Sequence, residues 1–107
     1  MMYKKISAVD TAFLLQNNSK VAMLDVREKD ELSICHIERA LHIPIAEIPN
    51  RYEELPKNMP LIVFCHHGMR SLKVVQFLEE KGFQNALNLT GGINEWSNTV
   101  DRKMPKY

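Results

Sequence analysis

Hydrophobic and polar residues alternate along the chain in a pattern typical of an α/β protein. Four short apolar runs are separated by longer stretches in which apolar residues recur at helical spacing. The runs occupy residues 21–24, 40–43, 61–64 and 86–89. The pattern predicts parallel strands joined by helices, with a further short edge strand at residues 3–6.

The run at residues 61–64 is apolar at all four positions and shows no polar alternation. A strand of this kind is expected where helices cover both faces of a parallel sheet. We therefore predict that residues 61–64 form the middle of the sheet.

The first predicted helix follows residue 7. Ser7, with Asp10 after it, is typical of a helix N-terminal cap. An apolar face is expected on this helix, and its members fall one helical turn apart: Val9, Ala12, Phe13 and Gln16.

The clearest helical pattern begins soon after Cys65. Leu72, Val75 and Leu78 share one stripe, with apolar side chains beside them and charged or amide side chains opposite. Gly82 suits the left-handed position just past the helix, and Phe83 is expected to fold back onto Leu78. A last short helix is predicted at residues 92–99, with Trp96 turned inward.

Composition and charge indicate one globular domain without a polyanionic or membrane partner. The 107 residues are 45% apolar and 25% charged, and the formal net charge is +1, so we expect no nucleic-acid or membrane binding. The first ten residues lead into only a short apolar stretch, interrupted by Asp10 and without a clear small-residue cleavage site. With two cysteines only, we expect a cytoplasmic protein whose thiols are reduced.

The segment after the central strand carries the candidate chemistry. It reads Phe64-Cys65-His66-His67-Gly68-Met69-Arg70-Ser71 and connects a buried strand to a helix. Ligands gather at the carboxyl ends of parallel strands, where helix N-termini present unpaired N–H groups. A thiol at that position gains stabilisation of its thiolate, and Gly68 lets the loop curl so that amide hydrogens point inward. We therefore expect Cys65 to have a lowered pKa, in surroundings that favour anions.

These residues resemble the active-site loop of the rhodanese family of sulfurtransferases, which reads Cys-x-x-Gly-x-Arg. The resemblance extends from about residue 6 to residue 99, and its further motifs are Asp25-Val26-Arg27, His36-Ile37 with Ala40 and Ile43-Pro44, Gly82-Phe83, and Gly91-Gly92-Ile93 with Trp96. It implies a single domain with a five-stranded parallel sheet, flanked by helices on both faces. It also implies that Cys65 carries sulfur as a persulfide.

The length of the loop favours sulfur transfer over phosphoryl transfer. Four residues lie between Cys65 and Arg70, whereas the related cysteine phosphatases have five in the corresponding loop. The tighter ring suits one additional sulfur atom rather than a phosphate group.

The expected reaction needs no cofactor or metal. The Cys65 thiolate takes sulfur from a small anionic donor such as thiosulfate, or from a persulfide, and passes it to a thiol, to cyanide or to a protein. Arg70 is the candidate for orienting an anionic donor, and the N–H groups of residues 66–71 are the candidates for holding the negative charge.

The residues around Cys65 and Arg70 are expected to shape or support the site. At least one of His66 and His67 is expected to face solvent, and Met69 to shape the rim of the pocket. Asp25 and Arg27 are expected to brace the loops as a buried pair. Cys35 stands where the family commonly has glycine, which predicts either a strained residue or a rebuilt turn; a role as a resolving thiol is less favoured than a structural one.

Other functions stay open on the sequence alone. The fold is also used as a regulatory module that has lost its cysteine, but Cys65, Gly68 and Arg70 are all present here. A protein-to-protein sulfur relay would use the same chemistry with a different partner. A zinc site built from cysteine and histidine is disfavoured because no Cys-x-x-Cys or His-x-x-x-His spacing occurs.

Overall fold

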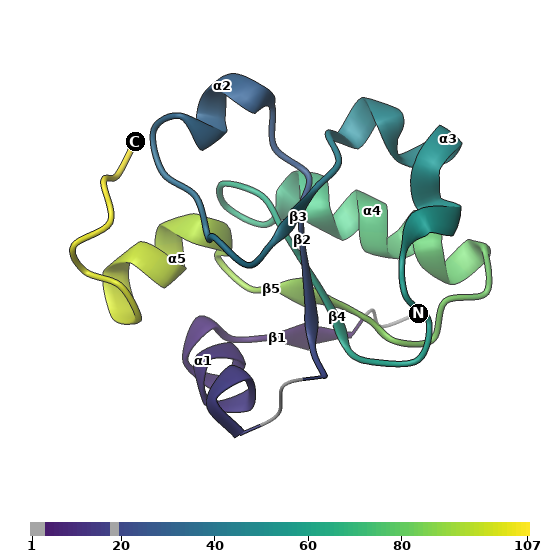
Figure 1. Cartoon of the computed structure of the whole chain (residues 1–107), viewed down its shortest axis with the longest axis horizontal. Helices are drawn as coiled ribbons and strands as arrows, with labels where there is room; N and C mark the ends of the chain where they lie inside the picture. The colour runs from purple at the N-terminus through teal and green to yellow at the C-terminus, as the bar shows by residue number, and fades with distance from the viewer. Residues whose placement is uncertain (1–3, 18–19) are drawn as a thin grey trace.

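The computed structural model describes residues 4–17 and 20–107 and shows a five-stranded parallel sheet (Figure 1). The strand order is β1-β5-β4-β2-β3. The strands are β1 (Lys5–Ile6), β2 (Ala22–Asp25), β3 (Leu41–His42), β4 (Leu61–Phe64) and β5 (Ala86–Leu89). Strand β4 lies at the centre, as the unbroken apolar run predicts. The edge strand expected at residues 3–6 is confirmed at residues 5 and 6, and Tyr3 lies outside the described residues.

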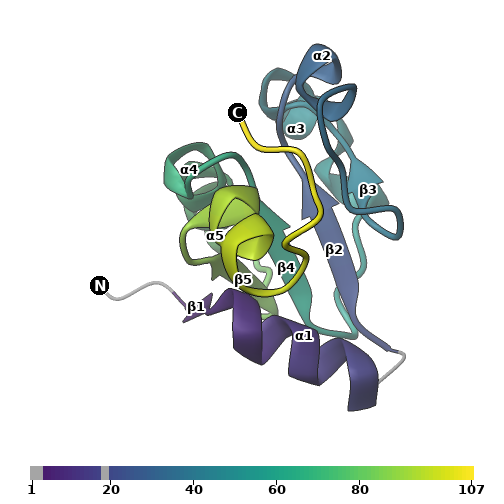
Figure 2. The same ribbon diagram turned by 90° about the vertical axis from the view of Figure 1, so that its left-hand side faces the viewer.

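Helices connect the strands and cover both faces of the sheet, as Figures 1 and 2 show. The α-helices are α1 (Ala8–Asn17), α2 (Lys29–Leu32), α3 (Ile48–Arg51), α4 (Met69–Glu80) and α5 (Gly92–Thr99). Two 3₁₀ turns, Ile45–Glu47 and Tyr52–Glu54, flank α3. No helix in the described ranges is both long and apolar enough to cross a bilayer.

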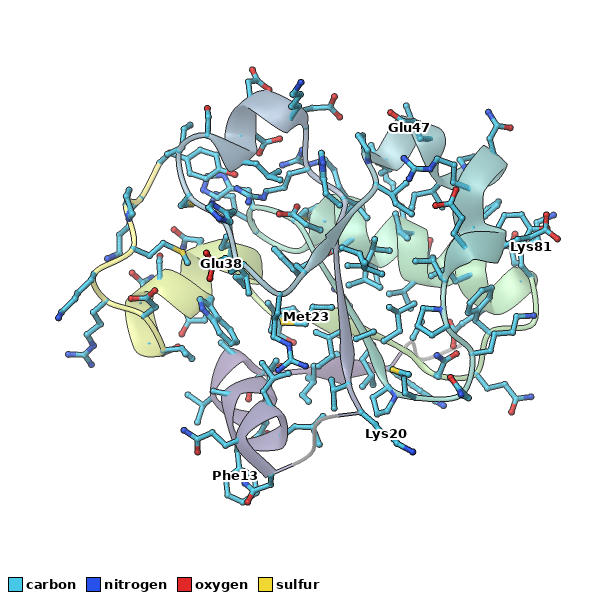
Figure 3. All side chains as sticks on the ribbon, in the orientation of Figure 1. Phe13, Lys20, Met23, Glu38, Glu47 and Lys81 are labelled. Carbon is cyan, nitrogen blue, oxygen red and sulfur yellow. The ribbon has the colours of Figure 1, made fainter. Side chains whose placement is uncertain are left out.

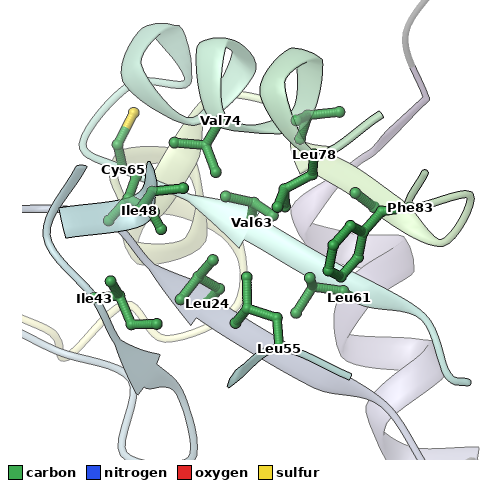
Figure 4. Packing of buried hydrophobic residues seen from close by; sticks show 13 residues of the cluster. Leu24, Ile43, Ile48, Leu55, Leu61, Val63, Cys65, Val74, Leu78 and Phe83 are labelled. Carbon is green, nitrogen blue, oxygen red and sulfur yellow. The ribbon is translucent and has the colours of Figure 1, made fainter. Parts of the chain in front are cut away.

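Two apolar clusters hold the layers together. One includes Leu24 and Val63 from the sheet and Val74 and Leu78 from α4 (Figure 4). The other includes Ile62 and Phe64 with residues from α1 and α5, among them Trp96. Because successive side chains of a strand point to opposite faces, the four apolar residues of β4 supply both clusters. This explains why β4 shows no polar alternation.

The helix ends follow the local signals in the sequence. Ser7 Oγ accepts a hydrogen bond from the N–H of Asp10 at 3.0 Å, which confirms the predicted cap of α1. At the end of α4, Gly82 has φ +92°, and the N–H of Phe83 donates to the carbonyl of Leu78 at 3.0 Å. This is the predicted left-handed termination with Phe83 folded back.

The predicted apolar face of α1 is confirmed only at Ala12, which packs against the cluster around Ile62 and Phe64, and is wrong at its other positions. Val9 and Phe13 are exposed, and Figure 3 shows Phe13 pointing away from the sheet, whereas Ala8 and Thr11 are buried. Thr11 was not expected inside because it is polar. Its hydroxyl donates to the carbonyl of Ser7 at 2.8 Å, so the side chain enters the core with its hydrogen bond already satisfied.

The segment after α5 turns back toward α2. Figures 1 and 2 both show it running from α5 toward α2, where the chain ends. Two hydrogen bonds of the Tyr107 hydroxyl anchor it there: it donates to Glu31 at 2.7 Å and accepts from Arg27 at 2.9 Å. The segment therefore lies beside the carboxyl ends of the central strands.

Candidate active site

Cys65 follows β4 directly and precedes α4, so it lies at the carboxyl end of the central strand. Its side chain is buried, with 1% of its surface exposed. Figure 4 shows the sulfur directed toward the first turn of α4, away from the apolar side chains of the cluster. The thiol is buried, but its sulfur faces the polar backbone of a helix N-terminus.

Backbone N–H groups converge on this sulfur. The N–H of Gly68 donates to Cys65 Sγ at 3.1 Å, and the N–H of Ser71 donates at 3.4 Å. Gly68 adopts φ +113°, a conformation that side chains strongly disfavour, and this allows the loop to close around the sulfur. These two amides are unpaired donors at the start of α4, so the sulfur supplies the acceptor that the helix lacks.

A polar network behind the loop fixes its shape. The Ser71 hydroxyl lies 3.4 Å from Cys65 Sγ and donates to Asn88 Oδ1 at 2.6 Å. The Asn88 amide in turn donates to the carbonyl of Gly68 at 3.2 Å. Gly68 and Ser71 are thereby both tied to Asn88 on β5. Asn88 was missed as a site residue, although a lone amide within an apolar strand is a signal that could have revealed it.

Helix α5 supports the loop from the other side. The N–H of Ile93 donates to the carbonyl of Cys65 at 2.9 Å, and the N–H of Asn94 donates to the carbonyl of His66 at 3.0 Å. Gly92 has φ +62°, and a Cβ there would lie 2.5 Å from both carbonyl oxygens. A glycine is therefore required at this close approach.

Hydrogen bonds to the sulfur lower the pKa of the Cys65 thiol. Burial alone raises the pKa of the thiol, but the Ser71 hydroxyl and the N–H groups of Ser71, Gly68 and Arg70 together outweigh burial. The net result is a pKa below the ordinary value for cysteine. A larger thiolate fraction near neutral pH makes the sulfur a better nucleophile.

The two histidines of the loop lie in different environments. His67 is exposed, as expected for one of the pair. His66 stacks on the Tyr107 ring with centroids 3.7 Å apart and an angle of 4° between the planes. Burial, with a smaller contribution from His67, lowers the pKa of His66 and so favours its neutral imidazole. Met69 is 72% exposed, at the outer side of the loop.

Arg70 is paired with a residue that the sequence did not single out. Its two terminal nitrogens donate to the carboxylate of Glu31 at 2.7 and 2.9 Å in a bidentate pair. Residues 65–71 contain no acidic side chain, but the fold brings Glu31 to Arg70 from 39 residues away in the sequence. The hydrogen bonds from Arg70 lower the pKa of Glu31 to about 2, so Glu31 is ionised.

Asp25 and Arg27 form the expected buried ion pair, with 2.8 Å between Arg27 Nη2 and Asp25 Oδ2. Arg27 also donates to the carbonyl of Cys35 at 2.8 Å, which ties the loop after α2 to the end of β2. Among the described residues only glycines have positive φ, so Cys35 occupies its position without left-handed strain. Cys35 is buried, and both cysteines are free thiols.

Within the described ranges, no three His, Cys, Asp or Glu side chains are grouped so that they could hold a metal ion. The groups that the described residues bring to the site are the Cys65 sulfur with its amide donors, the Ser71 hydroxyl and the Arg70–Glu31 pair.

The fold and this loop define a class of protein. A family model described as the rhodanese-like domain matches residues 9–99. The chain belongs to the rhodanese-like family, in agreement with the resemblance seen in the sequence.

Individual relatives carry names related to sulfur transfer. The thiosulfate sulfurtransferase GlpE of Coxiella burnetii is 38% identical over 96 residues, which cover 90% of this chain and 89% of that protein. The putative sulfur carrier protein YrkF of Bacillus subtilis is 30% identical over 81% of this chain and 47% of its own length. The crystal structure of a rhodanese-related protein from Thermoplasma volcanium superposes with a TM-score of 0.81 at 35% identity, covering 92% of this chain and 94% of that one.

Proposed function

We propose that this protein is a sulfurtransferase that moves a sulfane sulfur from thiosulfate or a persulfide to a thiophilic acceptor, through a persulfide on Cys65. One observation carries the proposal: the buried sulfur of Cys65 accepts hydrogen bonds from the N–H groups of Gly68 and Ser71, which lower its pKa. Similarity to proteins named as sulfurtransferases supports the same class of reaction.

In the first step the Cys65 thiolate attacks the outer sulfur of the donor. With thiosulfate, a new S–S bond forms at Cys65 while the S–S bond of the donor breaks, and sulfite leaves with the bonding electron pair. With a persulfide donor, the leaving group is the corresponding thiolate. In both cases the product is Cys65–S–S⁻, and charge is conserved.

In the second step the acceptor attacks the terminal sulfur of Cys65–S–S⁻. Cyanide then leaves as thiocyanate and a thiolate leaves as a new persulfide, and each reaction regenerates the Cys65 thiolate. The N–H groups of residues 66–71 are the proposed donors to the negative terminal sulfur. The proposal places this chemistry in the cytoplasm, where free thiols such as Cys35 and Cys65 stay reduced.

The decisive experiment measures thiocyanate formation from cyanide with several donors, in wild type and in Cys65→Ser. Wild type is expected to turn over, and Cys65→Ser to lose activity. Mass spectrometry of the donor-treated protein is expected to find an adduct of about 32 Da, one sulfur atom, on Cys65. Cys35→Ser is the matched control and should keep the activity. Sulfur transfer that survives in Cys65→Ser would reject Cys65 as the sulfur carrier, and a wild type that forms neither thiocyanate nor an adduct would leave a non-enzymatic module as the alternative.

A protein-to-protein sulfur relay is a second candidate. It is favoured by the similarity to a protein named as a putative sulfur carrier. A slow rate of Cys65 loading with thiosulfate, together with a fast rate from a protein persulfide, would support the relay over a thiosulfate-dependent enzyme.

A further inference from the structure

Glu31 is held in place beside the active-site loop by four donors. Its carboxylate accepts both terminal nitrogens of Arg70, the hydroxyl of Tyr107 at 2.7 Å and the N–H of Glu28 at 3.0 Å. The last bond belongs to a capping box at the start of α2, so the carboxylate is anchored to its own helix. Glu31 therefore cannot leave Arg70 without giving up contacts to three separate segments.

This arrangement changes the charge that a donor meets at Cys65. The side chain of Arg70 is 34% exposed, and both terminal nitrogens of its guanidinium are engaged by Glu31. The pair is neutral as a whole, because Glu31 is ionised at neutral pH. Burial raises the pKa of Tyr107 to about 12, so its phenol is uncharged at pH 7, and burial also lowers the pKa of His66, which favours its neutral imidazole.

The buried Arg27–Asp25 pair is likewise neutral. Lys73, one turn further along α4, is exposed and lines a different groove with Ile45 and Phe77. The ionised sulfur of Cys65 therefore remains as the uncompensated charge among these groups. A donor approaching the site meets one negative charge and a set of amide dipoles, with the cation of Arg70 already neutralised.

We propose that Glu31 is a specificity-determining residue, which neutralises Arg70 and so disfavours a dianionic donor such as thiosulfate relative to a persulfide with a single negative charge. This inference rests on the proposed function and names the donor class that the site prefers. Coulomb energy scales with the product of the charges, so a dianion experiences twice the effect of a monoanion. Glu31 acts through Arg70 and takes no part in bond breaking.

The test is Glu31→Gln, which keeps the shape and the acceptor oxygen of the capping box but removes the charge. The measured quantity is the single-turnover rate at which the sulfur adduct forms on Cys65, at subsaturating donor and without an acceptor. Thiosulfate carries two negative charges, and cysteine persulfide carries one net negative charge. Rates are compared at a pH where alkylation shows the same Cys65 thiolate fraction in both proteins.

We expect Glu31→Gln to speed loading from thiosulfate by about tenfold and loading from cysteine persulfide by only about threefold, because the logarithm of the change follows donor charge. The matched control is Asp30→Asn, which removes an exposed carboxylate from the same helix and should change neither rate. An equal gain with both donors, or the same gain in Asp30→Asn, would overturn the inference, as would unchanged or slower loading from thiosulfate.

A measurement on wild type keeps the test independent of how the variant folds. Raising the ionic strength from about 0.01 M to about 1 M shortens the screening length from about 30 Å to about 3 Å. Loading from thiosulfate is expected to accelerate, because repulsion from a net negative site is screened, and a slower rate would show that the cation of Arg70 dominates. If no donor produces an adduct on wild-type Cys65, the proposed function itself fails; adducts that form at rates independent of Glu31 and of salt remove only this inference.

Discussion

Gly92→Ala tests whether α5 supports the loop around Cys65. A Cβ at this position would lie 2.5 Å from the carbonyl oxygens of Cys65 and His66 and 2.6 Å from the carbonyl carbon of His66. These contacts are backbone atoms of the loop that holds the sulfur, and they cannot rotate away as the end of a side chain can. The loop and the start of α5 must therefore move apart in the variant.

The magnitude follows from two contributions. A φ of +62° costs an alanine about 1–2 kcal/mol relative to glycine. Overpacking against fixed backbone adds about 1–3 kcal/mol. Gly82→Ala is the matched control, because Gly82 also has positive φ, +92°, and a Cβ there has no atom within 4 Å. The difference between the two variants isolates the close approach to the loop.

Urea denaturation and iodoacetamide alkylation provide the two readouts. Gly92→Ala is expected to lower the free energy of unfolding by about 1–3 kcal/mol more than Gly82→Ala does. It should also slow the alkylation of Cys65 near neutral pH, because the N–H groups leave the sulfur, whereas Gly82→Ala should not. Equal destabilisation of the two variants, with unchanged alkylation, would refute the view that α5 braces the loop.

Three further predictions concern individual contacts. Ser71→Ala removes a hydroxyl whose proton, donated to Asn88 in this structure, can rotate toward the ionised sulfur of Cys65 3.4 Å away. The variant is expected to raise the pKa of the thiol, so that alkylation below that pKa slows about fivefold, the loss of one hydrogen bond of about 1 kcal/mol; an unchanged pH profile would contradict this. Asp25→Asn leaves the Arg27 charge buried without its partner and should lower the free energy of unfolding by about 3–5 kcal/mol in urea titrations; a loss well below that range would show that the pair is dispensable. The folded-state pKa of Glu31, about 2, lies below its ordinary value of 4.5, so its contribution to stability is complete above about pH 4.5 and disappears as the pH falls toward 2. Thermal melts of Glu31→Gln should lack this part of the acid dependence, and identical profiles would argue against the pair with Arg70.

The sequence predicts most of the fold because the decisive signals are local. The limits of β4 and β5 match the predicted runs, and α5 spans the predicted residues 92–99. These elements are buried on the faces that their apolar residues define. The helix α1 is the exception, because hydroxyl burial at Thr11 depends on a bond to the backbone that apolarity does not report.

The sequence likewise predicts the site residues that are close to one another along the chain, but not those that are distant. Cys65, Gly68 and Ser71 are separated by six residues at most, so the turn from strand to helix brings them together and the sequence shows it. Glu31 and Tyr107 reach the loop across 39 and 41 residues, counted from Arg70 and His66. Only the strand order of the folded sheet places such residues side by side, and no spacing rule along the chain encodes their contacts.

The ionisation of Cys65 is the central claim, and the pH dependence of its alkylation measures it most directly. The rate of iodoacetamide modification at Cys65 is followed by peptide mass spectrometry from pH 5 to pH 10, a range of about five pH units around the ordinary value for a thiol. A midpoint clearly below about 8.5, the value for a free cysteine, is the predicted result. A midpoint at or above that value would contradict the account, because burial would then outweigh the N–H groups that face the sulfur.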